Sequence, residues 1–373
     1  MQRTFITVAI CTLLLAGCVT AQQEHAQTAR ASEADRIVQA AMDAGHLPSI
    51  SVAVSSNGRI VYEKAFGLAN VAMETRATPA TVYAQGSVTK VLTAISALML
   101  ANKHLVDLDA PVQQYCPAFP RKQDNVTLRQ LLGHTAGIRH YNYRQFEKDF
   151  LNKVTYATIP DALVKFKDDP LVASPGEKYH YSSWGYVVAA CAIEGVSKQS
   201  FNDFVVTQIL APAGMSHSQM DKPNLGLPSR ATGYSLQEDG TLKVSEALNP
   251  SDRYGASGLL STPSDMIRFS TALLDGKLVG GDALEMMWSP QPLADGGNSG
   301  HGLGWDLDEK FHAVGKGGSA FDATSYLYLV PSNDLVVAIS TNRILWDDGR
   351  LELARDLARV FSSGTGALVG QDQ

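Results

Sequence analysis

Two residues at the start of an apolar segment have the types and spacing of a nucleophile and its base. Ser87 and Lys90 lie three positions apart in QGSVTKVLTAISALML, residues 85–100, where a polar turn becomes an apolar helical pattern. Residues three or four apart lie on the same side of a helix, so the amine can reach the hydroxyl. A serine hydroxyl becomes a nucleophile when a neighbouring base takes its proton. A lysine can be that base if burial or a helix N-terminus lowers its pKa from about 10.4.

The same spacing also fits a plainer interpretation, in which a helix-capping serine stands beside a solvated lysine. Ser87 and Lys90 nevertheless form the only Ser-x-x-Lys of the chain, and no Gly-x-Ser-x-Gly nucleophile elbow competes with them. The helix start would also direct the backbone N–H of Ser87 outward, as one half of an oxyanion hole. We therefore take Ser87 as the candidate nucleophile.

Two further stretches carry groups that could assist such a serine. Tyr181, in PGEKYHYSSWGY (175–186), precedes an apolar helical pattern, and lysines nearby could hold it as a phenolate that moves protons. An aromatic wedge at a helix start is an equally good interpretation. Lys316, in HAVGKGGSAF (312–321), precedes glycines that would let a substrate approach a strand edge. Alone, that stretch favours a glycine turn with an exposed lysine.

The elements that must position these residues come from both ends of the chain. The alternating runs SISVAVSS and RIVYEKAFG meet at Asn57-Gly58, which predicts a hairpin. Runs over 323–331 and 334–342 predict a second hairpin, followed by a helix over 348–360. The stretch between residues 107 and 250 is richer in helix signals. The sequence predicts an α+β fold, in which helices flank one antiparallel sheet built from both chain ends and a largely helical region is inserted.

This organisation divides the chain into five parts, of which the sheet part consists of two separate ranges. The active site is expected between the sheet part and the inserted part. An amphipathic helix that opens at Ser32 would begin the sheet part. The expected parts are a lipoprotein signal peptide over 1–17, a flexible tether over 18–31, the sheet part over 32–106 and 251–362, the helical inserted part over 107–250, and a disordered tail over 363–373.

The N-terminus has the pattern of an export signal. A basic residue precedes an apolar run that is too short to span a membrane. Leu15-Ala16-Gly17-Cys18 resembles the bacterial lipobox, in which cleavage leaves the cysteine as a lipid-bearing N-terminus. The alternative is a plain secretory signal cut near Ala21. We expect an exported protein that is anchored to a membrane through Cys18 and faces the periplasm.

Composition excludes some partners and leaves two cysteines to explain. The net charge is -6 and no Lys/Arg-rich run could follow a phosphate backbone, so nucleic acid is not expected as a partner. His134 and His140 do not stand at metal-binding spacing, and we expect neither a metal nor a cofactor. His134 is expected to form a structural hydrogen bond between helices. Cys116 and Cys191 could pair in an exported protein, but they show no disulfide or metal spacing, so the sequence favours buried free thiols.

Taken in order, the three motifs resemble those of a known superfamily. Ser87-Val88-Thr89-Lys90, Tyr181-Ser182-Ser183 and Lys316-Gly317-Gly318 are similar to the Ser-x-x-Lys, Tyr-x-Asn and Lys-Thr-Gly or His-x-Gly motifs of serine β-lactamases and penicillin-binding proteins. The resemblance is to the class C and esterase-like branch and covers nearly the whole chain after the signal. LVDLDAPVQQYCPAFP (105–120) and GIRHY (137–141) are especially similar to mitochondrial serine β-lactamase-like proteins, which are regarded as peptidases.

The resemblance implies a role for each matching residue. Ser87 would be the nucleophile, Lys90 its proton acceptor, Tyr181 the proton relay to the leaving group, and Lys316 the electrostatic support of Tyr181. The N–H groups of Ser87 and Ser319 would hold the oxyanion. Ser183, Gly317 and Gly318 would contact the substrate.

Two positions depart from the motifs of that superfamily. Ser183 replaces the asparagine that holds an acylamino group, and its hydroxyl is shorter. Gly317 replaces a threonine whose hydroxyl lies near a substrate carboxylate. Both changes weaken the case for turnover of β-lactams.

The sequence thus predicts a serine hydrolase that forms an acyl-enzyme on peptide or ester substrates. The substrate would be a small molecule or a peptide. A class C-like β-lactamase is the alternative within the enzymes. A catalytically inactive lipoprotein that binds peptide or envelope material is the alternative of another class.

Overall fold

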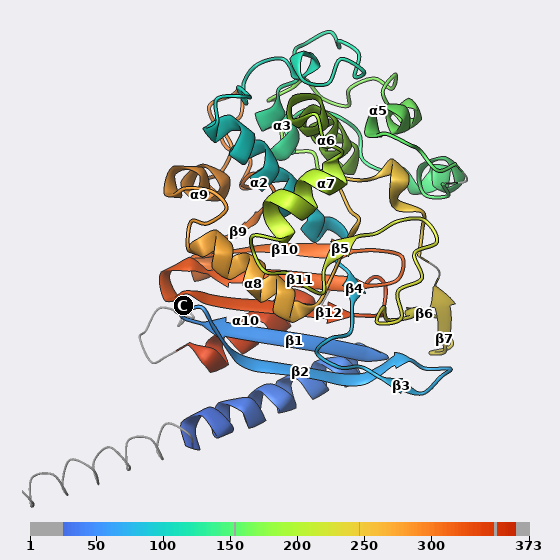
Figure 1. The fold of residues 1–373 in the computed structure, drawn as a ribbon, viewed down its shortest axis with the longest axis vertical. Helices are drawn as coiled ribbons and strands as arrows, with labels where there is room; N and C mark the ends of the chain where they lie inside the picture. Colours follow the sequence, from blue (N-terminus) through green and yellow to red (C-terminus); the bar gives the residue numbers. More distant parts are fainter. Residues whose placement is uncertain (1–24, 153, 246, 347–348, 363–373) are drawn as a thin grey trace, which may run out of the picture.

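The computed structural model describes residues 25–152, 154–245, 247–346 and 349–362. The predicted signal peptide, Cys18 and the predicted tail over 363–373 lie outside the described residues. The described part forms a sheet layer with helices on both faces and a helical region beyond the end of the sheet that β10 and β9 form (Figure 1). This arrangement confirms the predicted α+β class with an antiparallel sheet built from both chain ends.

The main sheet has seven strands in the order β3-β2-β1-β12-β11-β10-β9. β1 pairs with β12, so the N-terminal and C-terminal hairpins lie side by side. The predicted turn at Asn57-Gly58 is present, and both residues adopt the positive φ that a two-residue hairpin turn requires. The strands are β1 (Ser49–Ser56), β2 (Arg59–Asn70), β3 (Thr75–Arg76), β9 (Asp306–Asp308), β10 (Ala313–Ser319), β11 (Thr324–Val330) and β12 (Leu335–Thr341).

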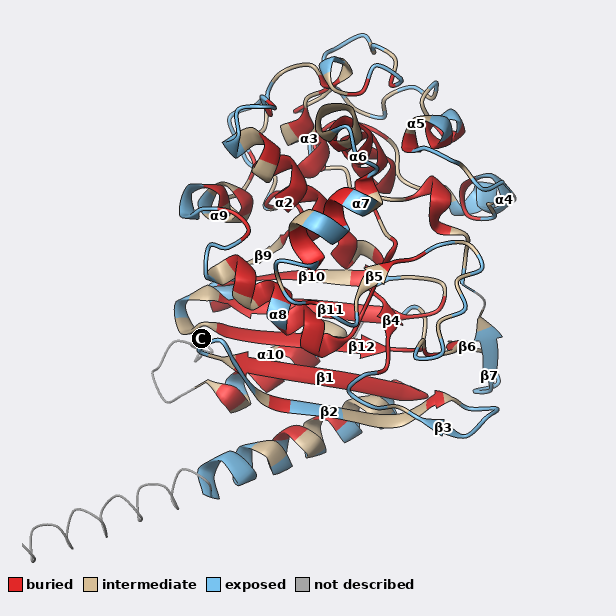
Figure 2. Ribbon diagram, viewed as in Figure 1, coloured by how far each residue is buried: buried red, intermediate tan, exposed pale blue. Residues whose placement is uncertain are grey.

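Side-chain alternation gives each face of this sheet its own core. On β1, Val52 and Val54 point to a face covered by the helix across residues 25–44 and by α10 (Arg350–Phe361). Ala53 points to the opposite face, against α2 (Thr89–Asn102) and α8 (Pro263–Leu274). Figure 2 shows the middle strands buried, as expected for a sheet that is covered on both sides.

The predicted tether is wrong over residues 25–31, because helix covers residues 25–44. Ser32 therefore does not open the helix; its hydroxyl instead donates to the carbonyl of Thr28, one turn earlier. The pattern SEADR suggested a helix cap, but residues before it also have good helix propensity. The first buried residue of this helix is Ala34, so its first turns lie in solvent.

The long helix α6, several shorter helices and two small sheets occupy the remaining chain. The helices are α3 (Leu128–Leu132), α4 (Phe146–Asp149), α5 (Ile159–Ala162), α6 (Ser183–Ser197), α7 (Phe201–Val205) and α9 (Gly281–Trp288). The small sheets are β4 (Tyr83–Ala84), β8 (Leu259–Ser261) and β5 (Gln219–Met220), and the hairpin of β6 (Gly233–Leu236) with β7 (Leu242–Ser245). Among the described residues, no helix has both the length and the apolar character needed to cross a membrane.

Helix α2 is buried more completely than its sequence pattern predicts. The apolar positions 91, 92, 95, 98 and 99 suggested one buried face, yet Thr93 and Ser96 are fully buried too. Their hydroxyls are satisfied because Thr93 donates to the carbonyl of Gly255 and Ser96 to that of Leu92. α2 is thus a central helix, packed between the sheet and the helical region. A side chain in its first turn can therefore be shielded from water.

The expectation of free thiols is wrong, because Cys116 and Cys191 form a disulfide. Cys116 follows the 3-10 turn Val112–Gln114, and this turn packs on α6, which carries Cys191. The two Cα atoms lie 5.5 Å apart although 75 residues separate them in the sequence. A contact so distant in sequence leaves no local spacing signal.

We predict that this disulfide stabilises the fold substantially. Closing a loop of 75 residues restricts the unfolded chain by roughly 4 kcal/mol in the chain-entropy model. Urea unfolding of the oxidised protein should therefore have a clearly higher midpoint than unfolding with a reductant present. The variant Cys116→Ala/Cys191→Ala is the control, since its midpoint should not respond to the reductant. Equal midpoints for oxidised and reduced wild type would contradict the prediction.

Candidate active site

Ser87 and Lys90 lie together at the entrance of α2. The 3-10 turn Gly86–Val88 carries Ser87, which is partly exposed, and leads into α2, where Lys90 is fully buried. The Nζ atom of Lys90 lies 3.0 Å from the Oγ atom of Ser87, 3.0 Å from the Oγ atom of Ser183 and 2.9 Å from the carbonyl oxygen of Ala256. The amine therefore contacts the candidate nucleophile and two further oxygen atoms in the protein interior.

These contacts fit a neutral amine. Burial lowers the pKa of Lys90, and the charge of nearby Lys316 acts in the same direction. A neutral amine has two N–H donors and one lone pair. It can donate to the carbonyl of Ala256 and to Ser183, and its lone pair can then accept the hydroxyl proton of Ser87. The geometry thus offers a base for Ser87.

Tyr181, from the segment before α6, contacts the same hydroxyl. Its phenol oxygen lies 2.8 Å from the Oγ atom of Ser87. Burial acts to raise the pKa of this phenol, but the positive charge that Lys90 carries when it is protonated, together with the charge of Lys316, outweighs burial and lowers the pKa to about 8. A phenol with a pKa near neutrality can both give and take a proton. Ser87 thus has two proton-transfer groups within hydrogen-bond distance.

Local structure before α6 fixes the position of Tyr181. Ser182 caps α6 by accepting the N–H of Gly185. The Nδ1 atom of His134 accepts the N–H of Ser182, and the His134 ring lies 4.4 Å from the Tyr181 ring between centroids. His134 follows α3, so the predicted structural hydrogen bond between helices is confirmed.

Strand β10 brings Lys316 to the site. Its ammonium lies 2.9 Å from the Oδ1 atom of Asp306 and 5.4 Å from the centre of the Tyr181 ring. Burial acts against the charge of Lys316, but Asp306 outweighs it and raises its pKa. Lys316 is therefore a fixed cation beside Tyr181. Sequence reasoning missed Asp306, which belongs to no motif.

The second half of β10 packs against the turn that carries Ser87. β9 pairs with the start of β10, at Ala313–Gly315, and the later part of the strand faces the turn Gly86–Val88. Glycines permit the contact: a Cβ atom on Gly318 would lie 2.0 Å from the carbonyl oxygen of Gln85, and one on Gly86 would lie 2.7 Å from the backbone N of Ser319. The backbone N of Ser319 therefore lies against the turn that carries Ser87.

The two departures from the motifs have a structural counterpart. A Cβ atom on Gly317 would lie 2.7 Å from an Nη atom of Arg350, so the guanidinium occupies the side-chain space of that position. Ser183, the first residue of α6, uses its hydroxyl for Lys90, and its N–H donates to the Nδ1 atom of His140. Burial lowers the pKa of His140 to about 3, so this imidazole is a neutral acceptor.

These residues line one cleft of about 750 Å³ between the sheet and the helical region. Neither His140 nor Arg350 was expected there, because each stands outside the motifs and reaches the cleft only through the fold. Lys90 lies beneath the surface of the cleft. The candidate residues on the lining are Ser87, Tyr181, Ser183, Lys316, Gly317 and Ser319. Within the described ranges, no group of three or more His, Cys, Asp or Glu residues could hold a metal ion.

Comparison with known sequences gives a family and distant relatives. The model of the family described as beta-lactamase matches residues 34–361. The protein flp of Staphylococcus aureus (strain NCTC 8325 / PS 47) is 25% identical to this chain over 319 residues. That alignment covers 83% of this chain but only 62% of flp, so the chain spans less than two thirds of that relative.

Solved structures share the fold. The octameric penicillin-binding protein homologue from Pyrococcus abyssi matches with a TM-score of 0.73 and 28% identity, over 83% of this chain and 73% of that protein. A D-stereospecific amidohydrolase from Streptomyces sp. matches with a TM-score of 0.70 and 24% identity, over 83% of this chain and 94% of the other. The second match is evidence of fold alone.

We predict that Tyr181 ionises near pH 8, well below an ordinary tyrosine. Difference absorbance near 295 nm should detect one phenolate that forms around this pH in wild type and is missing in Tyr181→Phe. Lys316→Met should raise the pKa of Tyr181, because it removes a neighbouring cation. Lys310→Met, on an exposed turn, is the matched control and should leave the titration unchanged. A wild-type titration without this step would contradict the assignment.

Proposed function

This chain belongs to the beta-lactamase family, and on that premise we propose that it is a serine hydrolase acting on peptide or ester substrates through a covalent acyl-enzyme. The observation that carries the proposal is the convergence on one hydroxyl. Lys90 and Tyr181 both lie within 3.0 Å of the Oγ atom of Ser87. A serine with two proton-transfer partners at hydrogen-bond distance fits nucleophilic catalysis.

In the acylation step, the Oγ atom of Ser87 would attack the substrate carbonyl. The new C–O bond forms while the hydroxyl proton moves to the neutral amine of Lys90. The carbonyl oxygen becomes an oxyanion, which the N–H groups of Ser87 and Ser319 would stabilise. The close contact between Gly86 and the backbone N of Ser319 supports this pairing.

The proposed cycle restores the protonation state of Ser87, Lys90 and Tyr181. Tyr181 donates its phenol proton to the leaving group as the bond to the acyl carbon breaks, which leaves a phenolate and the ammonium of Lys90. The phenolate then takes a proton from a water molecule that attacks the acyl-enzyme. Ser87 leaves the acyl carbon and recovers a proton from Lys90. Lys316, paired with Asp306, would stabilise the phenolate between the two half-reactions.

The departures favour peptides or esters over β-lactams. Ser183 has no side-chain amide to offer to an acylamino group, and its hydroxyl contacts Lys90. Arg350 fills the space in which a threonine would lie beside Gly317. Both changes leave Ser87, Lys90 and Tyr181 in place. We therefore rank hydrolysis of β-lactams below hydrolysis of peptides or esters.

We also propose that the protein is exported and held in the cell envelope by a lipid on Cys18. The support is the order of Leu15-Ala16-Gly17-Cys18 after a short apolar run. Peptides of the envelope would then be accessible substrates. Neither a cofactor nor a metal takes part in the proposed reaction.

We predict that a fluorophosphonate forms an adduct on Ser87. Intact mass should rise by one adduct in wild type and stay unchanged in Ser87→Ala, while hydrolysis of p-nitrophenyl esters should fall by about 10⁴-fold or more. Ser257→Ala, another serine on the cleft lining, is the control and should still be labelled.

Three outcomes separate the alternatives. A long-lived penicillin adduct, with turnover of esters or D-amino acid peptides, supports the proposal. Fast release of penicillin with hydrolysis of nitrocefin supports the β-lactamase alternative. A folded protein without any adduct or turnover contradicts the proposal and supports a binding protein.

We predict that Cys18→Ala releases the protein from membranes. Wild type expressed in a bacterium should sediment with membranes and carry a diacylglyceryl mass increase at its N-terminus. The variant should lack this modification. Cys11→Ala, inside the apolar run, is the control and should leave processing unchanged. A soluble wild type with a cut near Ala21 would contradict the lipid anchor.

A further inference from the structure

The cleft has two chemically different sides around Ser87. Tyr181 and Lys316 mark the side of the leaving group, because the proposed reaction has Tyr181 protonate that group. Ser183 and Ser319 flank the nucleophile elsewhere on the lining. The acyl group of a substrate must leave the carbonyl carbon in the direction away from the leaving group. The surface beyond Ser183 and Ser319 is therefore where the acyl group would lie.

The segments that carry Ser183 and Ser319 both lie next to one cluster of aromatic side chains. Beyond Ser183, His140 stacks on Tyr141 at 4.7 Å between ring centres, and Tyr141 packs edge-on against Phe150 at 5.2 Å. Two residues beyond Ser319, Phe321 lies 5.4 Å from Phe150 and 5.8 Å from Phe146. We call Tyr143, Phe146, Phe150 and Phe321 the aromatic lobe, and all four line the cleft.

The aromatic lobe connects the two parts of the molecule. Phe146 and Phe150 come from the segment around α4, and Phe321 comes from the turn between β10 and β11. Phe146 and Phe150 stack at 5.1 Å, and Phe146 is 38% exposed although it is a large apolar residue. An aromatic surface of this kind, open to the cleft, can accept an apolar group from a substrate.

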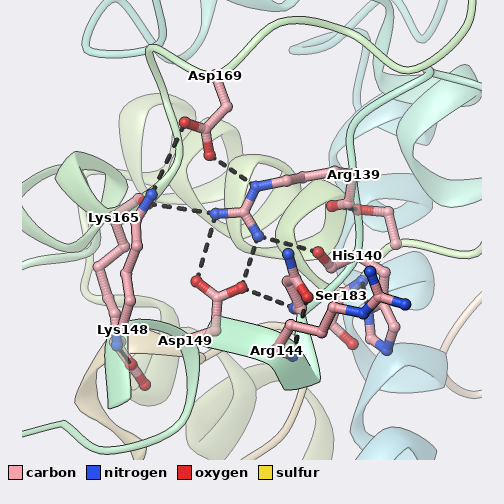
Figure 3. Close-up of polar contacts among 11 residues, drawn as sticks. Arg139, His140, Arg144, Lys148, Asp149, Lys165, Asp169 and Ser183 are labelled. Carbon is pink, nitrogen blue, oxygen red and sulfur yellow. Dashed lines mark hydrogen bonds and ion pairs between the residues drawn. The ribbon is translucent and has the colours of Figure 1, made fainter. Parts of the chain in front are cut away.

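A buried ion pair holds the α4 segment in place (Figure 3). The guanidinium of Arg139 lies between Asp149 and Asp169, with N–O distances of 2.6 Å to each carboxylate. Asp149 is fully buried and also accepts the N–H of Asn142. The carboxylate thus anchors the residue before Phe150 to the loop that begins at Arg139. The lobe is consequently a fixed surface and needs little ordering when a ligand binds.

The polar side chains of the cleft lining beyond Ser183 and Ser319 already have partners within the protein. The hydroxyl of Ser183 contacts Lys90 and stands where an amide would otherwise face an acylamino group. Among the charged side chains of this lining, Arg253 pairs with Asp252, Arg230 pairs with both Asp221 and Asp322, and Arg350 contacts the hydroxyl of Ser319. An acyl group with its own amide would have to desolvate that amide against aromatic rings.

We propose that the aromatic lobe is the acyl-binding subsite of this enzyme and selects substrates with an apolar acyl group, such as a linear or aryl-substituted aliphatic chain, over acylamino substrates. The inference rests on the proposed hydrolase function and adds its substrate class. Phe146 and Phe321 are the residues that determine this specificity, because they come from opposite walls and meet over the cleft.

Two esters of matched length test the selection. The p-nitrophenyl esters of pentanoic acid and of N-acetylglycine have acyl chains of the same number of backbone atoms, but only the second contains an amide. Each kcat/KM is divided by the rate of alkaline hydrolysis of that ester, which removes the difference in intrinsic reactivity. We expect wild type to prefer pentanoate by about tenfold or more.

Variants of the lobe should change this ratio specifically. Phe146→Ala and Phe321→Ala should each lower the preference for pentanoate by about fivefold to tenfold, while hydrolysis of the acetate ester changes by less than about twofold. Tyr156→Ala removes an aromatic residue outside the cleft lining and is the matched control. A wild-type preference for N-acetylglycine, or a ratio that neither Phe variant changes, would overturn the proposal.

A binding measurement keeps this outcome distinct from failure of the hydrolase proposal. Ser87→Ala cannot turn over substrate but keeps the lobe, and octanamide should bind to it saturably by ligand-observed NMR. The additional change Phe321→Ala should weaken that binding about tenfold. Absent turnover together with lobe-dependent binding would remove the hydrolase function and keep the apolar subsite. Absence of saturable binding to Ser87→Ala would overturn the subsite.

Discussion

Burial of one amine is the constraint on which the rest of this structure depends. Lys90 can act as a base near neutral pH only if it is dry, since water would restore an ordinary lysine pKa. A dry position in the first turn of α2 requires protein on every side of that helix. The sheet supplies one side and the helical region the other, and Ala256 and Ser183 accept the N–H groups that burial would otherwise leave unsatisfied. The two-part architecture is therefore a requirement of the chemistry.

The second requirement is that strand β10 approaches the nucleophile without side chains in between. Gly86 and Gly318 meet this requirement, because a Cβ atom on either would collide with the backbone of the opposing segment. Lys316 then lies on the same strand, two residues before Gly318, with Asp306 holding its charge. One short stretch of strand thus supplies both a fixed cation and a backbone edge, and the spacing Lys-x-Gly reflects this geometry.

The sequence was most informative where a feature is local. The Asn57-Gly58 turn, the second hairpin and the pairing of Ser87 with Lys90 each depend on residues a few positions apart, and spacing alone indicates them. Features that join distant segments gave no such signal. Cys116 meets Cys191 across 75 residues only after the chain has folded, and Asp306, although it lies near Lys316 in the sequence, stands outside the three motifs. Even the burial of Thr93 in α2 follows from packing on both sides and contradicts its polarity.

The departures from the superfamily motifs are better understood as a coordinated set than as losses. At position 317 the absence of a side chain makes room for the guanidinium of Arg350, which comes from α10. At position 183 a short hydroxyl completes the oxygen shell of Lys90, where a longer amide would extend into the cleft. The proton-transfer groups around Ser87 are thereby retained while the surface offered to a substrate changes. Ser183 and Gly317 lie within two residues of Tyr181 and Lys316, so the surface offered to a substrate can diverge while the proposed reacting groups stay in place.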